Sequence, residues 1–194
     1  MKLIISLTIL FFVFSAPQAR ADVTPGWLIQ PSLMYYFKTE GGNPPNNAST
    51  TETRELGDIL LGYTFGNIFL GANYNYDAII LSGNTTSTDS FQSIGGDLGI
   101  MTDNIFLFFT YYFSSTAATG QGLPNNGEVD FNKGTGYQVK LGYMFDVGSG
   151  WSLGPAITYK SLTYAAFASG VNSGMSTSFT FTTLVPEATI RYRF

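Results

Sequence analysis

Stretches of about ten residues in this chain alternate between apolar and polar side chains. An alternation with a period of two is the pattern of a β-strand that has one apolar face. About ten residues is also the length with which a tilted strand crosses a lipid bilayer. The sequence contains eight such stretches, at 27–38, 55–65, 68–77, 92–101, 105–113, 136–145, 151–164 and 184–194, the last extending back toward Phe179.

The connections between these stretches are sorted by length. Those at 66–67, 102–104 and 146–150 are short, whereas those at 39–54, 78–91, 114–132 and 165–176 are long and rich in Gly, Asn, Ser and Thr. Short and long connections alternate strictly, and both chain ends fall on the short side. Tight turns at one end and longer loops at the other are typical of barrels that cross the outer membrane.

The composition agrees with a lipid-facing surface. Charged residues make up only 11% of the chain and aromatic residues 16%, whereas soluble domains carry about 25% charged residues. Aromatic side chains at the strand ends predict belts at the two membrane surfaces. We therefore predict an all-β fold, an eight-stranded antiparallel up-and-down transmembrane β-barrel with short periplasmic turns and long outer loops. Because lipid offers no partner to bare backbone groups, the strands must close into a ring.

The N-terminus has the pattern of an export signal. A basic start at Met1-Lys2 is followed by an apolar run over 3–14 and by the small-residue motif Ala19-Arg20-Ala21. The run is shorter than the roughly 20 residues of a spanning helix. We expect residues 1–21 to be a signal peptide that is cleaved after Ala21, and residues 22–194 to form the barrel.

The last strand ends in an aromatic residue. Apolar side chains occupy every second position from Leu184 to Phe194. This stretch resembles the closing strand of bacterial outer-membrane barrels, and the whole mature chain resembles the small OmpA/OmpX-type eight-stranded barrels. The resemblance implies a bacterial outer-membrane location, a monomer, contact with outer-membrane lipid and lipopolysaccharide, and an assembly signal at Tyr192 and Phe194 that the barrel-assembly machinery reads.

The residues on the inward faces predict a filled interior. An eight-stranded barrel is just wide enough for side chains to fill it. Inward positions mix large aromatic residues with glycines, which suggests a plugged core; they are Tyr36, Phe69, Phe106, Phe108, Tyr112 and Gly62, Gly71, Gly95, Gly99, Gly142, Gly154.

Charged residues also point inward. Lys38, Asp58, Asp77 and Lys160 are expected toward the outer end, and Asp97, Lys140, Glu187 and Arg191 in the middle or lower half. Each layer mixes signs, so a structural network of ion pairs is the favoured interpretation. An ion path or a ligand site is the alternative, because polar groups at membrane depth are often functional.

Three prolines, Pro31, Pro155 and Pro186, lie inside predicted strands. Proline cannot donate to a strand ladder. Each therefore requires a bulge or a position near the end of a strand, and Pro186 fits this requirement least well because it lies well inside the last strand.

Several classes of function are excluded. The chain has no His and no Cys, which removes Ser-His-Asp catalysis, histidine or thiolate metal sites and disulfides. Asp58 and Asp77 could form a carboxylate pair, but nearby lysines favour a neutralised cluster. Without Lys2 and Arg20, the chain has seven basic and thirteen acidic residues, which gives a net charge of −6. We expect no enzyme, no cofactor and no binding of nucleic acid.

The function predicted from the sequence is that of an integral outer-membrane barrel that serves membrane integrity or surface contact through its outer loops, with a surface ligand that the sequence does not identify. One alternative is a narrow channel for small or hydrophobic solutes, with an interior gap or a lateral opening near Pro186. The other is an exported soluble β-sandwich. Apolar residues at 78–81 and 165–168 are expected to extend strands beyond the membrane, or else to form a contact surface.

Overall fold

A computed structural model describes residues 23–40, 50–83, 86–121, 129–165 and 178–194 of the protein. The predicted signal peptide, 1–21, and the predicted start of the mature chain at Asp22 lie outside the described residues, as do most of the predicted loops 39–54 and 165–176 and a part of 114–132.

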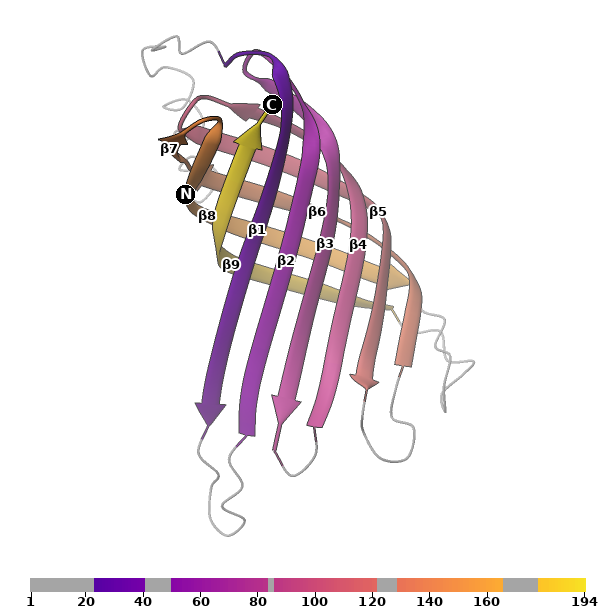
Figure 1. Cartoon of the computed structure of the whole chain (residues 1–194). Helices are drawn as coiled ribbons and strands as arrows, with labels where there is room; N and C mark the ends of the chain where they lie inside the picture. Colours follow the sequence, from indigo (N-terminus) through magenta and orange to yellow (C-terminus); the bar gives the residue numbers. More distant parts are fainter. Residues whose placement is uncertain (1–22, 41–49, 84–85, 122–128, 166–177) are drawn as a thin grey trace, which may run out of the picture.

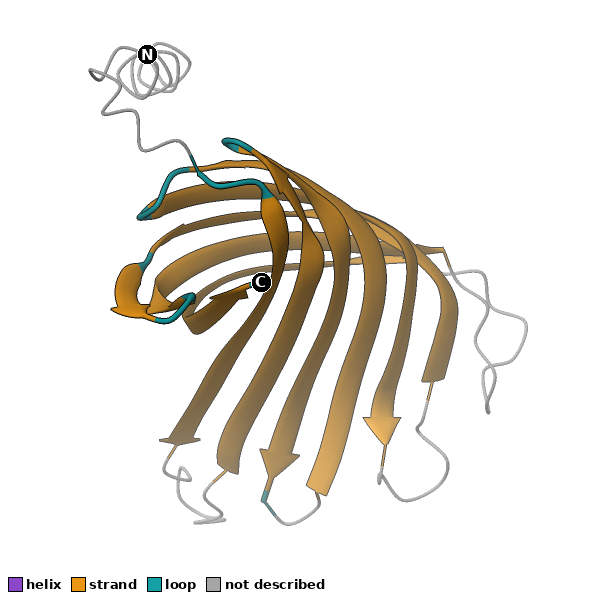
Figure 2. Ribbon diagram, turned by 45° about the horizontal axis from the view of Figure 1, so that its top comes forward, coloured by secondary structure: helices purple, strands orange, loops and turns teal. Residues whose placement is uncertain are grey.

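Nine strands form one antiparallel sheet that closes on itself. β6 is bonded on one side to β5 and on the other to β8, so the order β1-β2-β3-β4-β5-β6-β8-β9 returns to β1. Figures 1 and 2 show the resulting ring of long, tilted strands. The predicted eight-stranded antiparallel barrel is confirmed. The strands are β1 (Gly26–Glu40), β2 (Thr50–Phe65), β3 (Ile68–Ser82), β4 (Thr86–Met101), β5 (Ile105–Gln121), β6 (Val129–Tyr143), β7 (Phe145–Gly148), β8 (Trp151–Ala165) and β9 (Ser178–Arg193).

The short strand β7 is a continuation of β6. Gly142 pairs with Ala156 and Phe145 pairs with Leu153, which is the same register on β8. The interruption at Tyr143 and Met144 lies opposite Pro155 and Gly154, and Pro155 has no N–H to offer. The turn predicted at 146–150 is therefore shorter, and its sharpest part uses positive φ at Gly148, Ser149 and Gly150.

The first described residues, from Val23, and the C-terminus lie at one end of the barrel, which we call the inner end. The backbone N–H of Phe194 donates to the carbonyl of Trp27 over 3.0 Å. At the opposite, outer end most strands run further than predicted. The residues 78–81 belong to β3, as strand extension predicted, and β3 pairs with β4 out to Ser82 and Thr86. The long loop predicted at 78–91 is thereby reduced to the connection 83–85. Of the second apolar stretch, 165–168, only Ala165 lies within the described residues.

The barrel is apolar outside and largely polar inside. The outer wall carries apolar side chains that are between 48% and 67% exposed, for example Leu33, Ile59, Leu98, Ile157 and Leu184. Charged and amide side chains such as Asp58, Lys140 and Asn73 are at most 2% exposed inside. A soluble protein has the reverse arrangement. A closed sheet with an apolar wall is the arrangement that spans a lipid bilayer with every backbone group paired.

Aromatic rings form a belt around the inner end, as predicted for the membrane surface. Trp27 and Tyr63 meet edge to face at 5.6 Å, and Trp151 and Tyr192 meet at 4.6 Å between ring centroids. Tyr192 also contacts Phe194, which is 74% exposed. Among the described residues, no helix is both long and apolar enough to cross a membrane.

Large rings lie over small residues in the lumen. A Cβ atom on Gly71 would come within 2.5 Å of the Phe69 ring. The Phe108 ring contacts the rings of both Phe69 and Phe106 within an apolar layer that closes the inner end. The members of this layer are all at most 3% exposed: Val23, Leu28, Leu60, Phe69, Met101, Phe106, Phe108, Met144 and Ala156.

Candidate functional site

The middle of the lumen holds a cluster centred on Lys140. Its ammonium lies 2.8 Å from Asp58 Oδ1 and 2.7 Å from Glu187 Oε2. The side chains of all three residues are at most 2% accessible. One cation is therefore shared by two carboxylates. Asp58 on β2 and Glu187 on β9 lie on either side of β1, and Lys140 reaches them from β6 across the lumen. We call these residues the Lys140 cluster.

Neutral side chains add hydrogen bonds to Asp58 and Lys140. Asn73 donates to both oxygens of Asp58 over 3.1 and 3.0 Å, and Gln138 donates to Oδ2 over 3.2 Å. Lys140 also donates to Ser32 Oγ over 3.0 Å. The hydroxyl of Tyr112 lies 3.0 Å from the carbonyl oxygens of both Asn73 and Gln138. A buried carboxylate with this many donors is held as an anion in one position.

A second cluster, nearer the outer end, has the opposite charge pattern. Asp77 accepts two hydrogen bonds from the Arg54 guanidinium, over 2.9 and 2.6 Å, and one from Lys160 over 3.0 Å. Arg54 also donates to Thr183 across the lumen over 2.7 Å. Lys160 donates to Asn75 over 2.7 Å. We call Arg54, Asp77 and Lys160 the Asp77 cluster; here one carboxylate is shared by two cations.

The remaining charged residues predicted inside have other surroundings. Asp97 is 2% exposed and accepts a hydrogen bond from Thr110. Arg191 is fully buried, donates from Nε to Gln30 over 2.8 Å, and lies 4.9 Å above the Phe106 ring. Lys38 is exposed at the outer end of β1. All eight charged residues were predicted to point inward, and seven of them are buried in the lumen. The structure groups them differently from the two predicted layers.

Two details differ from the prediction. Asp58 was expected in the outer layer beside Asp77, whereas it bonds Lys140 in the middle. The ladder pairs Asp58 with Asn75 and Asp77 with Leu56, so the two carboxylates are offset along the strands. Arg54 was not predicted as an inward residue, because the predicted strand began at Glu55 and β2 begins at Thr50.

Aromatic residues fill the outer part of the lumen. Phe91 stacks on Phe181 at 4.3 Å, and Tyr164 stacks on Phe179 at 4.8 Å. With two aliphatic residues they form an apolar cluster whose buried members are at most 7% exposed: Phe91, Tyr112, Ala117, Phe131, Leu162 and Tyr164. The lining of a water-filled pore would be accessible to solvent, so the described lumen is closed by an apolar layer, two charged clusters and an aromatic layer.

The seam between β1 and β9 is the incomplete part of the wall. β1 pairs with β2 along its whole length, but with β9 only from Leu28 opposite Arg193 to Leu33 opposite Ala188. Among the described residues, no backbone pair joins 34–40 to 178–187. Figure 1 shows β9 following β1 near the C-terminus and bending away behind the barrel. The interruption begins next to Pro186, as the missing donor predicts.

Searches of known proteins give structural neighbours only. No family model matches the chain and no curated protein matches it. Among solved structures, the outer membrane protein OprG from Pseudomonas aeruginosa is similar with a TM-score of 0.41 and 8% identity, over 87% of this chain and 96% of that one. The outer membrane protein AlkL in lipid bilayers is similar with a TM-score of 0.41 and 12% identity, over 93% and 95%.

The chain has the architecture of an outer-membrane β-barrel. Its eight long strands close into a ring, its outer wall is apolar, and aromatic rings form a belt at its inner end. Among the described residues, no group of three or more metal-ligating side chains is arranged to hold a metal ion.

Proposed function

We propose that the protein is an outer-membrane β-barrel with a closed lumen, and that it acts at its outer end, in membrane integrity or in contact with a partner at the cell surface. The observation that supports this function is the layered filling of the lumen, in which the opposite net charges of the Lys140 and Asp77 clusters balance. Every side chain of the two clusters is at most 14% accessible. An interior of this kind stabilises the barrel and leaves no water-filled path along it.

Single-channel conductance tests this function. The protein is refolded in detergent, its folding is verified by heat-modifiable migration on a gel, and it is inserted into planar bilayers. A closed lumen predicts a baseline without steady discrete openings. Openings of constant amplitude from folded protein would contradict it, and their loss in a Lys140→Met variant would locate the path in the lumen.

A passage for hydrophobic solutes is a second candidate, and the incomplete β1–β9 seam favours it. Above Leu33 and Ala188 the wall has no backbone ladder, and the apolar side chains Phe37 and Leu184 on its two sides are each 67% exposed. An apolar solute could leave the outer lumen sideways into the lipid here without crossing the charged clusters.

A reversible cross-link tests this candidate, because the chain has no cysteine of its own. Cysteines at Phe37 and Leu184 occupy positions that would be opposite each other if the ladder continued past Leu33 and Ala188, so oxidation would join the two strands in a state in which the seam is closed. Uptake of an apolar fluorescent probe by cells that express the variant should fall on oxidation and return on reduction. Equal uptake in the two states, with each single-cysteine variant as control, would reject the lateral passage.

A further inference from the structure

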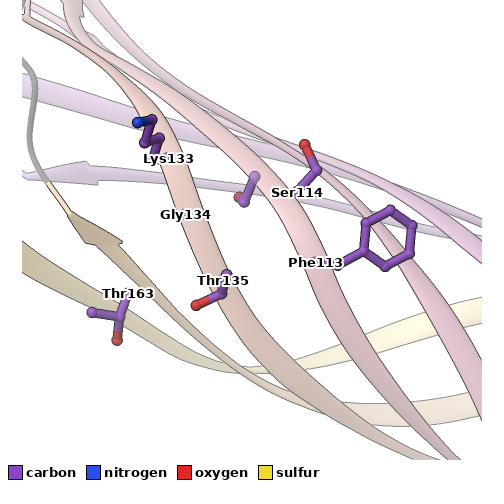
Figure 3. A pocket seen from close by; sticks show the side chains of 7 residues that line it. Phe113, Ser114, Lys133, Gly134, Thr135 and Thr163 are labelled. Carbon is purple, nitrogen blue, oxygen red and sulfur yellow. The ribbon is translucent and has the colours of Figure 1, made fainter.

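A groove on the outer wall lies apart from the lumen and is not used by the proposed function. It has a volume of about 310 Å³ and is lined by Phe113, Ser114, Ser115, Lys133, Thr135 and Thr163. These residues come from three neighbouring strands, β5, β6 and β8, as Figure 3 shows. Volumes of roughly 300–1,000 Å³ are usual for sites that bind small molecules.

The groove exists because the ladder between β5 and β6 is irregular. Tyr112 pairs with Gly136, Ser115 with Gly134, and Ala117 with Phe131, so the register shifts twice over a few residues. The shift separates the two strands locally. The floor of the groove is closed from inside, because Ser115 Oγ is bonded to Ser93 Oγ at 2.7 Å and to the Tyr164 hydroxyl at 2.9 Å. The groove therefore opens to the outside of the barrel and not to the lumen.

Its height on the wall is set by the side chains below it. On the same three strands, toward the inner end, the outward residues are the aromatic rings Tyr111, Tyr137 and Tyr159, between 37% and 54% exposed. Toward the outer end the outward residues are hydroxyls, and Thr163 is bonded to Thr180 at 3.1 Å. A change from amphipathic rings to hydroxyls marks the surface of the bilayer, so the groove lies where lipid headgroups lie.

The groove also carries an exposed cation at this height. Of the seven basic residues after Arg20, four are inside the barrel in ion pairs or on rings, namely Arg54, Lys140, Lys160 and Arg191. Arg193 lies at the inner end near Asp103, and Lys38 is at the outer end of β1. Lys133 is exposed and lines the groove together with Ser114 and Thr135.

We propose that this groove binds the phosphate-bearing headgroup of a membrane lipid, whose acyl chains lie against the apolar wall below. An ammonium group and hydroxyl donors are the partners that a phosphate accepts hydrogen bonds from. Phe113, 60% exposed, lies at the groove, and its ring contacts the upper part of the chains. A lipid fits better than a soluble anion, because the groove opens on the wall that faces the bilayer.

Native mass spectrometry of the refolded protein in a non-ionic detergent tests the proposal. The probes are dimyristoyl phosphatidic acid and dimyristoylglycerol, which has the same chains and no phosphate. We expect the wild type to retain phosphatidic acid at least fivefold better than dimyristoylglycerol. Lys133→Gln should abolish this preference, and Thr135→Val, which keeps the side-chain shape, should reduce it about threefold by removing one hydrogen bond.

The matched control is Lys38→Gln, which removes a lysine at the outer end but away from the groove. It should retain phosphatidic acid like the wild type, and heat-modifiable migration must show that every variant is folded. Equal retention by wild type and Lys133→Gln would overturn the proposal. Complete displacement of phosphatidic acid by equimolar inorganic phosphate would also overturn it, because the site would then recognise a free anion and not a lipid.

Discussion

The two charged clusters of the lumen are built from the same kinds of residue with the signs exchanged. In the Lys140 cluster one cation lies between two carboxylates, and in the Asp77 cluster one carboxylate lies between two cations. The net charges of the two clusters cancel, although each cluster alone carries a net charge. The difference lies in access to water, because the side chain of Arg54 is 14% accessible whereas those of Asp58, Glu187 and Lys140 are at most 2% accessible.

Water access decides what happens when a central residue is removed. A buried charge that loses its partner has to be solvated by whatever remains near it, and this is costly in a dry interior. In the Asp77 cluster the Arg54 guanidinium can turn toward the outer end. In the Lys140 cluster no member can do so. The comparison therefore predicts that the Lys140 cluster is the more sensitive of the two.

The largest effect is expected for Lys140→Met. It leaves the carboxylates of Asp58 and Glu187 buried without their shared cation, and the free energy of unfolding should fall by ~3–5 kcal/mol. Urea unfolding in phospholipid vesicles, followed by the fluorescence of Trp27 and Trp151, measures the loss. Lys38→Met, at an exposed position, should change it by less than ~0.5 kcal/mol. A similar small change for Lys140→Met would show that the cluster does not stabilise the barrel.

A smaller loss is expected for Asp77→Asn. The two cations then face each other, but Arg54 can reach water, so the free energy of unfolding should fall by about 2–3 kcal/mol. The comparison is sharpened by adding Lys160→Met to the same chain. If repulsion between the cations causes the loss, the double variant should be more stable than Asp77→Asn alone; a further loss would contradict this cause.

The architecture could be predicted from the sequence because a two-residue period assigns every strand residue to one of two faces. The pattern of Leu184 to Phe194 placed Glu187 and Arg191 inside and Tyr192 outside, and the structure has the same faces. The missing N–H of proline was also an informative signal, because Pro155 and Pro186 each lie beside an interrupted ladder. These features depend only on neighbours along the chain.

The grouping of charges could not be predicted, because it depends on the stagger between strands. Asp58 and Lys140 are far apart in sequence and lie on strands that do not pair, so their relative height follows from the tilt of the whole barrel. Strand length was the other limit. The residues of 50–54 look like a polar loop, and only the closed ring shows that Arg54 lies in β2 and reaches Asp77.

The donors around the Lys140 cluster give a third prediction. Tyr112→Phe removes the hydroxyl that lies 3.0 Å from both Asn73 and Gln138, while the ring still packs in the lumen. The charges of the cluster stay paired, so the free energy of unfolding should fall by only about 1 kcal/mol. Comparison with Lys140→Met separates the contribution of the neutral hydrogen bonds to the free energy of unfolding from the contribution of the ion pairs. A loss as large as that of Lys140→Met would mean that the hydroxyl holds the cluster together.

The smallest effect is expected at Arg191, although it is the largest fully buried side chain. It belongs to neither cluster; its described partners are the Gln30 amide and the Phe106 ring, and no carboxylate pairs with it. Desolvation of an unpaired guanidinium offsets much of what these contacts contribute. Arg191→Met removes the buried charge together with its contact to the Phe106 ring and leaves an unbranched apolar chain. The gain and the loss offset each other, so the free energy of unfolding should change by less than about 1 kcal/mol in either direction. A loss of stability as large as that expected for Lys140→Met would contradict this, because it would mean that Arg191 is paired with an anion.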